Sequence, residues 1–155
     1  MGEYSVHEGA LDATGMRFAI VAARFNHEVT EPLAAGAEKT LRDRGAADVH
    51  VAWVPGAFEL PLVAKRFAQS GAIDAVVCIG AVIRGETAHF EYVAGECAAG
   101  VTRASLDTGV PIAFGVLTVE DRKQAFDRVG GSEGHKGEEA ALTAIEMVSL
   151  LRDIP

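Results

Sequence analysis

The chain has 155 residues, of which 49% are hydrophobic and 23% are charged, a balance typical of one globular domain and not of a disordered segment. Its formal net charge is -8, which argues against non-specific binding to nucleic acid or to an anionic membrane surface. Residues 1–15 lack a signal-peptide pattern, and the longest apolar run, 75–83, is far shorter than the roughly 20 residues of a membrane helix, so we expect a cytoplasmic protein.

The first half of the chain predicts two strands, each followed by a helix. Residues 17–23 (RFAIVAA) form an apolar, β-rich run, and the helical stripe after them ends at the Arg-Gly pair 44–45. Residues 49–54 (VHVAWV) are the second predicted strand. The next helical stripe has Pro61 near its start and Gly71 after its end, which is the usual order of these two residues around a helix.

The second half of the chain repeats this pattern. Residues 75–83 (AVVCIGAVI) predict a third strand, and apolar residues recur with helical spacing over 90–101. Residues 111–118 (PIAFGVLT) predict a fourth strand. Cys78 and Cys97 lie in apolar surroundings without a C-x-x-C motif, so we expect buried, reduced thiols.

Two helices complete the predicted elements. Thr118 and Asp121 have the spacing of a capping box, which predicts a short helix that runs to about Val129. A last apolar stripe with helical spacing covers 140–151.

The order of these elements predicts the fold class. All four strands are apolar on both alternations, as in a parallel sheet that is covered on both faces. Strands that alternate with helices favour an α/β fold, a three-layer αβα sandwich around a four-stranded parallel sheet. We expect residues 1–15 to be a loose N-terminal segment and residues 16–155 to form a single domain.

Four loops follow the carboxyl ends of the predicted strands, where an open parallel sheet binds its ligands. Their sequences are RFNHE (24–28), PGAFE (55–59), RGETAH (84–89) and TVED (118–121). We therefore expect the functional residues of this chain to lie in or near these loops.

The loop at 84–89 completes a G-x-x-x-x-G-E-T pattern, which differs from a nucleotide-binding P-loop because Glu86 stands at the position of the lysine. The added negative charge disfavours ATP or GTP. Two interpretations remain open from this motif: a turn with a capped helix, or a site for a single phosphate at the N-terminus of the following helix.

His89 lies in the first turn of that helix, and histidine is the side chain that most often transfers protons at neutral pH, so His89 is a candidate acid or base. Phe25 could belong to the core or could stack on a planar ring. Glu59 could pair with an N–H-rich ring or could stabilise a helix N-terminus. Arg128 could serve a helix C-terminus or a phosphate. The other four histidines show no metal-ligand spacing, and we expect them on the surface.

Several segments of the chain together resemble the 6,7-dimethyl-8-ribityllumazine synthase family. They cover residues 17 to about 150, and their sequences are ARFN, WVPGAFELP, IGAVIRGETAHFEYV, GVPIAFGVLTVED, QAFDR and HKGEEAALTAIEM. The resemblance implies a flavodoxin-like fold and a transferase of riboflavin biosynthesis. This enzyme would condense 5-amino-6-(D-ribitylamino)uracil with 3,4-dihydroxy-2-butanone 4-phosphate and release phosphate and water, without a cofactor or a metal.

The resemblance also implies roles for individual residues. His89 would transfer protons, and Phe25 would stack on the uracil ring. The pyrimidine and ribityl pocket would be lined by Ala57, Phe58, Glu59, Ala81, Val82 and Ile83. The phosphate would be held by Glu86, Thr87 and Arg128, with Phe114 and Arg128 supplied by a neighbouring subunit. Lys136 and Glu139 match positions near the site, although the family's usual acid at the position of Glu139 is Asp.

The implied assembly is a homopentamer with active sites at the subunit interfaces, in some members built further into an icosahedral shell. Glu133 stands where shell-forming members carry Lys, so we expect a free pentamer. The predicted third helix is rich in small residues. It would line the five-fold contact, or it would pack only on its own sheet. Riboflavin synthase is a candidate partner, while a nucleic acid or a membrane is not expected. Two alternative functions remain: a flavin- or lumazine-binding module of the same fold that has lost activity, and a purely structural shell protein.

Overall fold

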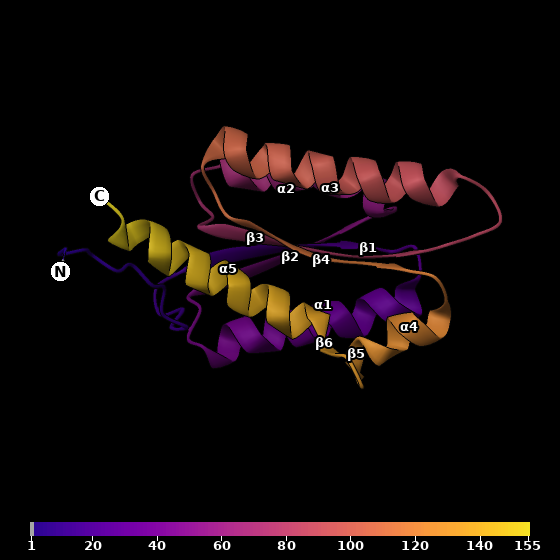
Figure 1. Ribbon diagram of the computed structural model, residues 1–155, viewed down its shortest axis with the longest axis horizontal. Coiled ribbons are helices and arrows are strands. Elements are labelled where there is room, and N and C mark those ends of the chain that lie inside the picture. The colour runs from indigo at the N-terminus through magenta and orange to yellow at the C-terminus, as the bar shows by residue number, and fades with distance from the viewer. Residues whose placement is uncertain (1) are drawn as a thin grey trace.

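The computed structural model describes residues 2–155 and has a four-stranded, all-parallel sheet at its centre (Figure 1). The strands are β1 (Arg17–Ala23), β2 (Asp48–Val54), β3 (Ala75–Ile83) and β4 (Ile112–Val119), and their order in the sheet is β2-β1-β3-β4. Strand order reverses between β1 and β3, since the chain first adds β2 on one side and then β3 and β4 on the other. This is the predicted sheet.

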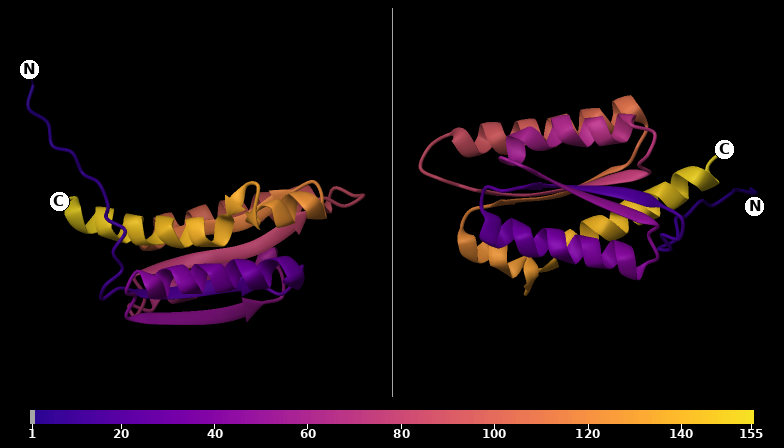
Figure 2. Two further views of the ribbon diagram at one scale, coloured as in Figure 1. Left: turned by 90° about the horizontal axis from the view of Figure 1, so that it is seen from below. Right: turned by 180° about the vertical axis from the view of Figure 1, so that it is seen from behind.

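Helices cover both faces of the sheet (Figures 1 and 2). One layer holds α2 (Leu60–Gln69) and α3 (His89–Thr108), and a 3-10 turn, Ala57–Glu59, leads into α2. The opposite layer holds α1 (His27–Asp43), α4 (Arg122–Asp127) and α5 (Lys136–Asp153). The predicted three-layer α/β sandwich is therefore confirmed.

The alternation of side chains along the central strands explains these layers. On β1, Phe18 and Ile20 are buried in the apolar cluster under α1 and α5, whereas Ala19 and Val21 are buried in the cluster under α2 and α3. Successive side chains of a strand point to opposite faces, so an entirely apolar strand needs a helix layer on each side. Cys78, on β3, is buried and free, as expected.

Strand β2 differs from the expectation that all four strands are covered on both faces. It lies at one edge of the sheet, and most of its residues are exposed or half-buried. Val51 is 41% exposed and Trp53 37% exposed. An edge strand has one paired neighbour, and in this chain the helices do not extend over its outer part. The prediction of burial on both faces was wrong for this strand.

The segment after β4 also differs from the prediction. Thr118 lies within β4, and the side chain that caps α4 is Asp121, whose Oδ1 accepts a hydrogen bond from the Gln124 N–H at 2.8 Å. The helix ends at Asp127, and the chain then forms a small antiparallel pair, β5 (Val129–Gly131) with β6 (Gly134–His135). The predicted Thr118 cap was therefore wrong, and the hairpin was not predicted.

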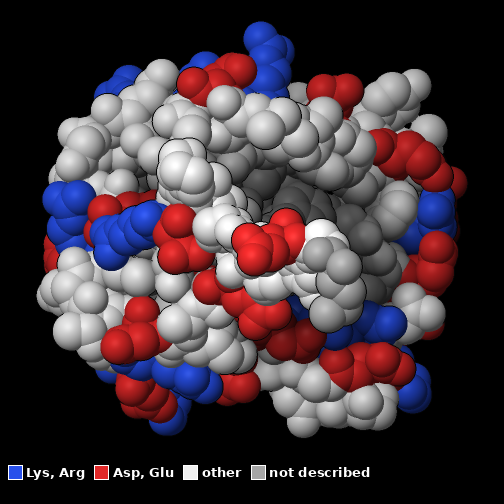
Figure 3. All heavy atoms as spheres, turned by 60° about the vertical axis from the view of Figure 1, so that its left-hand side comes forward, with Lys and Arg blue, Asp and Glu red and all other residues white. Residues whose placement is uncertain are grey.

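The N-terminal segment lies against the C-terminal half of α5. His7 Nδ1 is 2.7 Å from an Asp153 carboxylate oxygen, and the Ala10 N–H donates to Ser149 Oγ at 2.9 Å. On the end of the molecule that Figure 3 shows, acidic and basic side chains are interspersed. None of the helices described in residues 2–155 is long and apolar enough to cross a membrane. The loose character of residues 1–15 stays a prediction.

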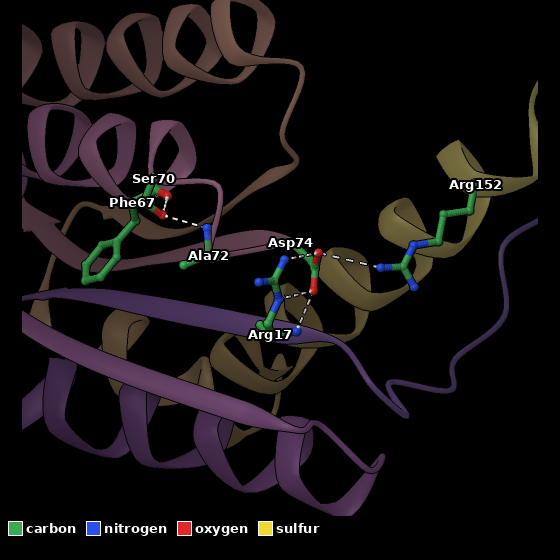
Figure 4. A network of polar contacts seen from close by, with 6 residues as sticks. All are labelled: Arg17, Phe67, Ser70, Ala72, Asp74 and Arg152. Atoms are coloured by element: carbon green, nitrogen blue, oxygen red, sulfur yellow. Dashed lines mark hydrogen bonds and ion pairs between the residues drawn. The ribbon is translucent and has the colours of Figure 1, made fainter.

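A polar network at the amino end of the sheet fixes β1, β3 and α5 to one another (Figure 4). The Arg17 N–H donates to Asp74 Oδ2 at 2.7 Å, and its guanidinium donates to both Asp74 carboxylate oxygens at 3.3 and 3.2 Å. Arg152 of α5 approaches the same carboxylate at 3.6 Å. Burial raises the pKa of Asp74, but the hydrogen bonds from Arg17 and both positive charges outweigh it, so the pKa is lower than usual.

Candidate active site

One cavity, the larger of two that contain predicted site residues, has a volume of about 710 Å³ and opens at the carboxyl ends of β1, β2 and β3. This edge, at the right-hand side of Figure 1, is where an open parallel sheet binds ligands. Nine of the predicted site residues line this cavity: Phe25, Ala57, Phe58, Glu59, Ala81, Val82, Ile83, Thr87 and His89. Three loops far apart in the sequence are therefore brought together as the strand positions predict.

The loop after β1 presents the Phe25 ring to solvent at the rim of this cavity, where it is 71% exposed. Its N–H donates to the Pro55 carbonyl at 3.1 Å, which ties it to the neighbouring loop. Asn26 has a left-handed backbone (φ 61°), and its side-chain Nδ2 donates to the Ala81 carbonyl at 2.8 Å. The high exposure of Phe25 excludes the core interpretation within this chain and leaves its ring free to stack on a ligand.

The loop after β2 contributes small, aromatic and acidic residues to the lining of the same cavity. Ala57 is buried and Phe58 is 58% exposed. Glu59 occupies the position before α2, but its side chain makes no hydrogen bond that caps this helix. The geometry therefore leaves the Glu59 carboxylate available to accept hydrogen bonds from a ligand in the cavity.

The loop after β3 contains the G-x-x-x-x-G-E-T pattern. Of its residues, Gly85 and Thr87 line the cavity, whereas Glu86 is exposed and is not among the lining residues. The cap position of α3 is Ala88, which has no side-chain cap, and Thr87 Oγ1 accepts the His89 N–H at a long 3.4 Å. The N–H groups at this helix end are weakly satisfied, which suits an anion better than a well-capped turn does.

The remaining predicted residues lie around a second, smaller cavity of about 510 Å³. Its lining includes Phe114 of β4, Arg128 at the end of α4, and Lys136 and Glu139 of α5. The guanidinium of Arg128 is half-buried and donates to the Gln124 carbonyl at 2.9 Å, and Lys136 Nζ lies 3.2 Å from Glu139 Oε1. This cavity shares no lining residue with the larger one, so one chain does not bring Arg128 to His89.

The charges of the two cavities are complementary. Among the described residues that line the larger cavity, none is Lys or Arg, although Glu59 and His89 are present. The smaller cavity carries Arg128 and Lys136. A phosphate group in the larger cavity would thus meet helix N–H groups but no cation from its own chain.

Two thiols and one histidine outside the cavities complete the list of candidate reactive groups. Burial raises the pKa of the Cys78 thiol, and it raises the pKa of Cys97 to about 11, so both are poor nucleophiles. His135 was expected on the surface, but it is half-buried, and its Nδ1 accepts the Glu138 N–H as the cap of α5. The expected surface position of His135 was wrong, because a side chain that caps a helix packs its ring against the end of that helix.

Two residues that contact the site were not among those predicted from the sequence. Asn26 holds the loop that carries Phe25 to β3 through its hydrogen bond to Ala81. The sequence could have indicated this residue, because an asparagine between a strand and a helix often takes a left-handed backbone or caps the helix. Arg84 follows β3 and makes ion pairs with two carboxylates, Glu91 and Glu120. Its partners lie 7 and 36 residues away in the sequence, so the contacts depend on the fold.

Known proteins are similar to this chain over nearly its whole length. The family model described as 6,7-dimethyl-8-ribityllumazine synthase matches residues 15–152. A protein of Syntrophus aciditrophicus (strain SB) named 6,7-dimethyl-8-ribityllumazine synthase is 56% identical over 152 residues, which cover 97% of this chain and 99% of that protein. Both matches extend over the sheet, both helix layers and both cavities. The chain therefore belongs to the 6,7-dimethyl-8-ribityllumazine synthase family.

Proposed function

We propose that this chain catalyses the condensation of 5-amino-6-(D-ribitylamino)uracil with 3,4-dihydroxy-2-butanone 4-phosphate to 6,7-dimethyl-8-ribityllumazine, in riboflavin biosynthesis. Family membership over nearly the whole chain is the observation that carries this proposal. The reaction forms an imine, eliminates phosphate and closes a ring. Forming the imine releases water, and both this step and the loss of phosphate require protons to be added and removed on the bound substrates. A histidine can transfer such protons, and the steps need neither a redox cofactor nor a metal.

In this proposal the larger cavity binds the uracil substrate. The Phe25 ring stacks on the pyrimidine, and the free carboxylate of Glu59 accepts hydrogen bonds from its N–H groups. The remaining wall of the pyrimidine and ribityl pocket is apolar or backbone and comes from Ala57, Phe58, Ala81, Val82 and Ile83. His89, exposed at the mouth of the cavity, transfers the protons.

The phosphate substrate lies at the N-terminus of α3 in this proposal, beside Glu86 and Thr87. The missing cation is Arg128 of a neighbouring subunit, which arrives with Phe114 and with Lys136 nearby. This is supported by the absence of Lys and Arg among the described residues that line the larger cavity, and by their presence in the smaller one. Joining the two cavities across an interface would complete the site.

The proposed assembly is a homopentamer in the cytoplasm. Helix α3 supports it, because only Cys97, Val101 and Ala104 of its 20 residues are buried in the single chain, while Tyr92 and Leu106 are 70% and 79% exposed. An apolar face of this kind favours contact with another subunit. We expect the pentamer to remain free, because of Glu133, and light scattering that gives a mass of several pentamers would contradict this. Riboflavin synthase stays a candidate partner.

Activity on the two substrates tests the proposed function directly. The purified chain should form a product with lumazine absorbance, and release phosphate, faster than the two substrates react without protein. His89→Gln should slow turnover and leave binding of the uracil substrate nearly unchanged. Tight binding of riboflavin without turnover would instead identify a binding module, and assembly without either activity would identify a structural protein.

A further inference from the structure

Arg84 joins three elements at the edge of the candidate active site. It directly follows β3, and its backbone N–H donates to the Val119 carbonyl at the end of β4 at 2.9 Å. Its guanidinium pairs with Glu91 in the first turn of α3, and its Nε lies 2.7 Å from Glu120 Oε2 in the connection from β4 to α4. One side chain thus bridges the elements that contribute to the two cavities.

The guanidinium of Arg84 also covers an aromatic ring next to His89. Its central carbon lies 4.3 Å from the centroid of the Phe90 ring, a distance typical of a cation–π contact. Phe90 lines the larger cavity and packs on the core beneath α2 and α3. Phe90 directly follows His89 in the first turn of α3. A movement of Arg84 would therefore displace the Phe90 ring and, with it, the backbone of His89.

The same contacts argue against a direct role of Arg84 as the cation that binds the phosphate. The guanidinium of Arg84 pairs with two carboxylates, so the three side chains together carry a net negative charge, which disfavours a phosphate. Glu86, two residues away in the sequence, adds a further negative charge. Its planar fork is suited to holding two acceptors in a fixed geometry, which the ammonium of lysine cannot reproduce.

We propose that Arg84 is a positioning residue: it clamps the first turn of α3 to the β4–α4 connection and so fixes His89 and the backbone N–H groups of the loop 85–88. This inference rests on the proposed function, because it assigns His89 the proton transfers. The loop needs such a clamp, since Gly85 has no side chain and residues 84–89 are all exposed.

The experiment must distinguish this positioning role of Arg84 from a role in the stability of the fold alone. The three charged side chains are 39%, 55% and 60% exposed, and ion pairs in such surroundings contribute little to folding. Arg84→Lys should therefore fold and assemble normally. A displacement of the catalytic group by an ångström or less already slows an enzyme, so we expect kcat to fall roughly tenfold while KM for both substrates changes less than about twofold.

The matched control is Arg103→Lys, because Arg103 lies on α3, the helix that Arg84 would hold, but is 84% exposed and lies 3.9 Å from Asp107. It should retain the kcat of the unmodified enzyme. Glu120→Gln should reproduce part of the loss, and the double variant with Arg84→Lys should be no slower than Arg84→Lys alone, because both changes break one clamp. Hydrogen–deuterium exchange of residues 84–92 should become faster in both variants and remain unchanged in the control.

Three results would overturn the inference. The first is an Arg84→Lys enzyme with unchanged kcat and unchanged exchange in residues 84–92. The second is a raised KM for the phosphate substrate with unchanged kcat, which would make Arg84 a substrate ligand. The third result applies if Arg84→Lys does not fold. It is a double variant, Glu91→Gln with Glu120→Gln, that folds and has unchanged kcat and unchanged hydrogen exchange in residues 84–92. Failure of the unmodified chain to turn over would refute the proposed function instead, while hydrogen exchange would still test the clamp.

Discussion

In the proposed site, the side chain of Arg128 supplies the positive charge that is absent from the described residues lining the larger cavity. If it reaches the phosphate of a substrate bound to the neighbouring subunit, Arg128→Ala removes a charge-assisted contact. We expect kcat/KM for the butanone phosphate to fall roughly 10- to 100-fold. Steady-state kinetics with the uracil substrate saturating measure this, and Arg42→Ala, on the exposed side of α1, should show no change. An unchanged kcat/KM in the Arg128 variant would remove this residue from the site.

Individual residues could be predicted where the loop sequence itself determines their position. Phe25, Glu59 and His89 each follow a strand directly or begin a helix, so the fold rule for parallel sheets places them at one edge. Arg84 could not be identified in this way. Its function depends on Glu120, which reaches it only because β4 pairs with β3.

At the scale of the elements, α1 and α5 pack closely because glycine lies in their contact. A Cβ at Gly137 would lie 2.1 Å from the Leu33 carbonyl oxygen of α1, and backbone cannot move aside cheaply. Gly137→Ala should therefore lower the free energy of unfolding by about 1–3 kcal/mol, the usual cost of an added core methyl group. Urea denaturation at fixed protein concentration measures it. Gly95→Ala, whose Cβ would meet nothing within 4 Å, is the control, and equal stability of both variants would contradict this packing.

The polar network at the amino end of the sheet makes a pH-dependent contribution to stability. The pKa of Asp74 is lowered in the folded chain relative to about 3.9 in unfolded chains. Its contribution is therefore fully present above pH 3.9 and is lost as the pH falls through the lowered value. Asp74→Asn should unfold more easily at neutral pH, and its deficit should shrink in acid. Thermal melts from pH 7 to pH 3 measure this, with Asp43→Asn on exposed α1 as control. A constant deficit would contradict the linkage.

The prediction of elements succeeded where apolar periodicity was long and failed where it was short. The predicted strands over 17–23 and 75–83 agree with β1 and β3, since burial on both faces requires uninterrupted apolar runs. The β5–β6 pair was missed because it spans only a few residues, Gly130 and Gly134 among them, and no apolar pattern marks it. The edge position of β2 was also missed, because the apolar pattern of a strand does not encode its place in the sheet.

At the scale of the whole molecule, the separation of the two cavities predicts that neither works alone. Phe25 and His89 belong to one cavity, whereas Arg128 belongs to the other. If active sites form between neighbouring subunits, two inactive variants can complement each other, because an interface in a ring joins different surfaces of identical subunits.

Complementation tests this assembly. One variant carries Phe25→Ala and His89→Ala, the other carries Arg128→Ala, and each alone should have little activity. Refolded together at equal amounts, they place an intact Phe25 and His89 beside an intact Arg128 in about a quarter of the sites of a randomly mixed ring. Activity should therefore return to about a quarter of that of the unmodified protein, while simple mixing of preformed assemblies should recover none. If each chain contained a complete site, no mixed interface could restore it, and activity after refolding would remain the average of the two variants.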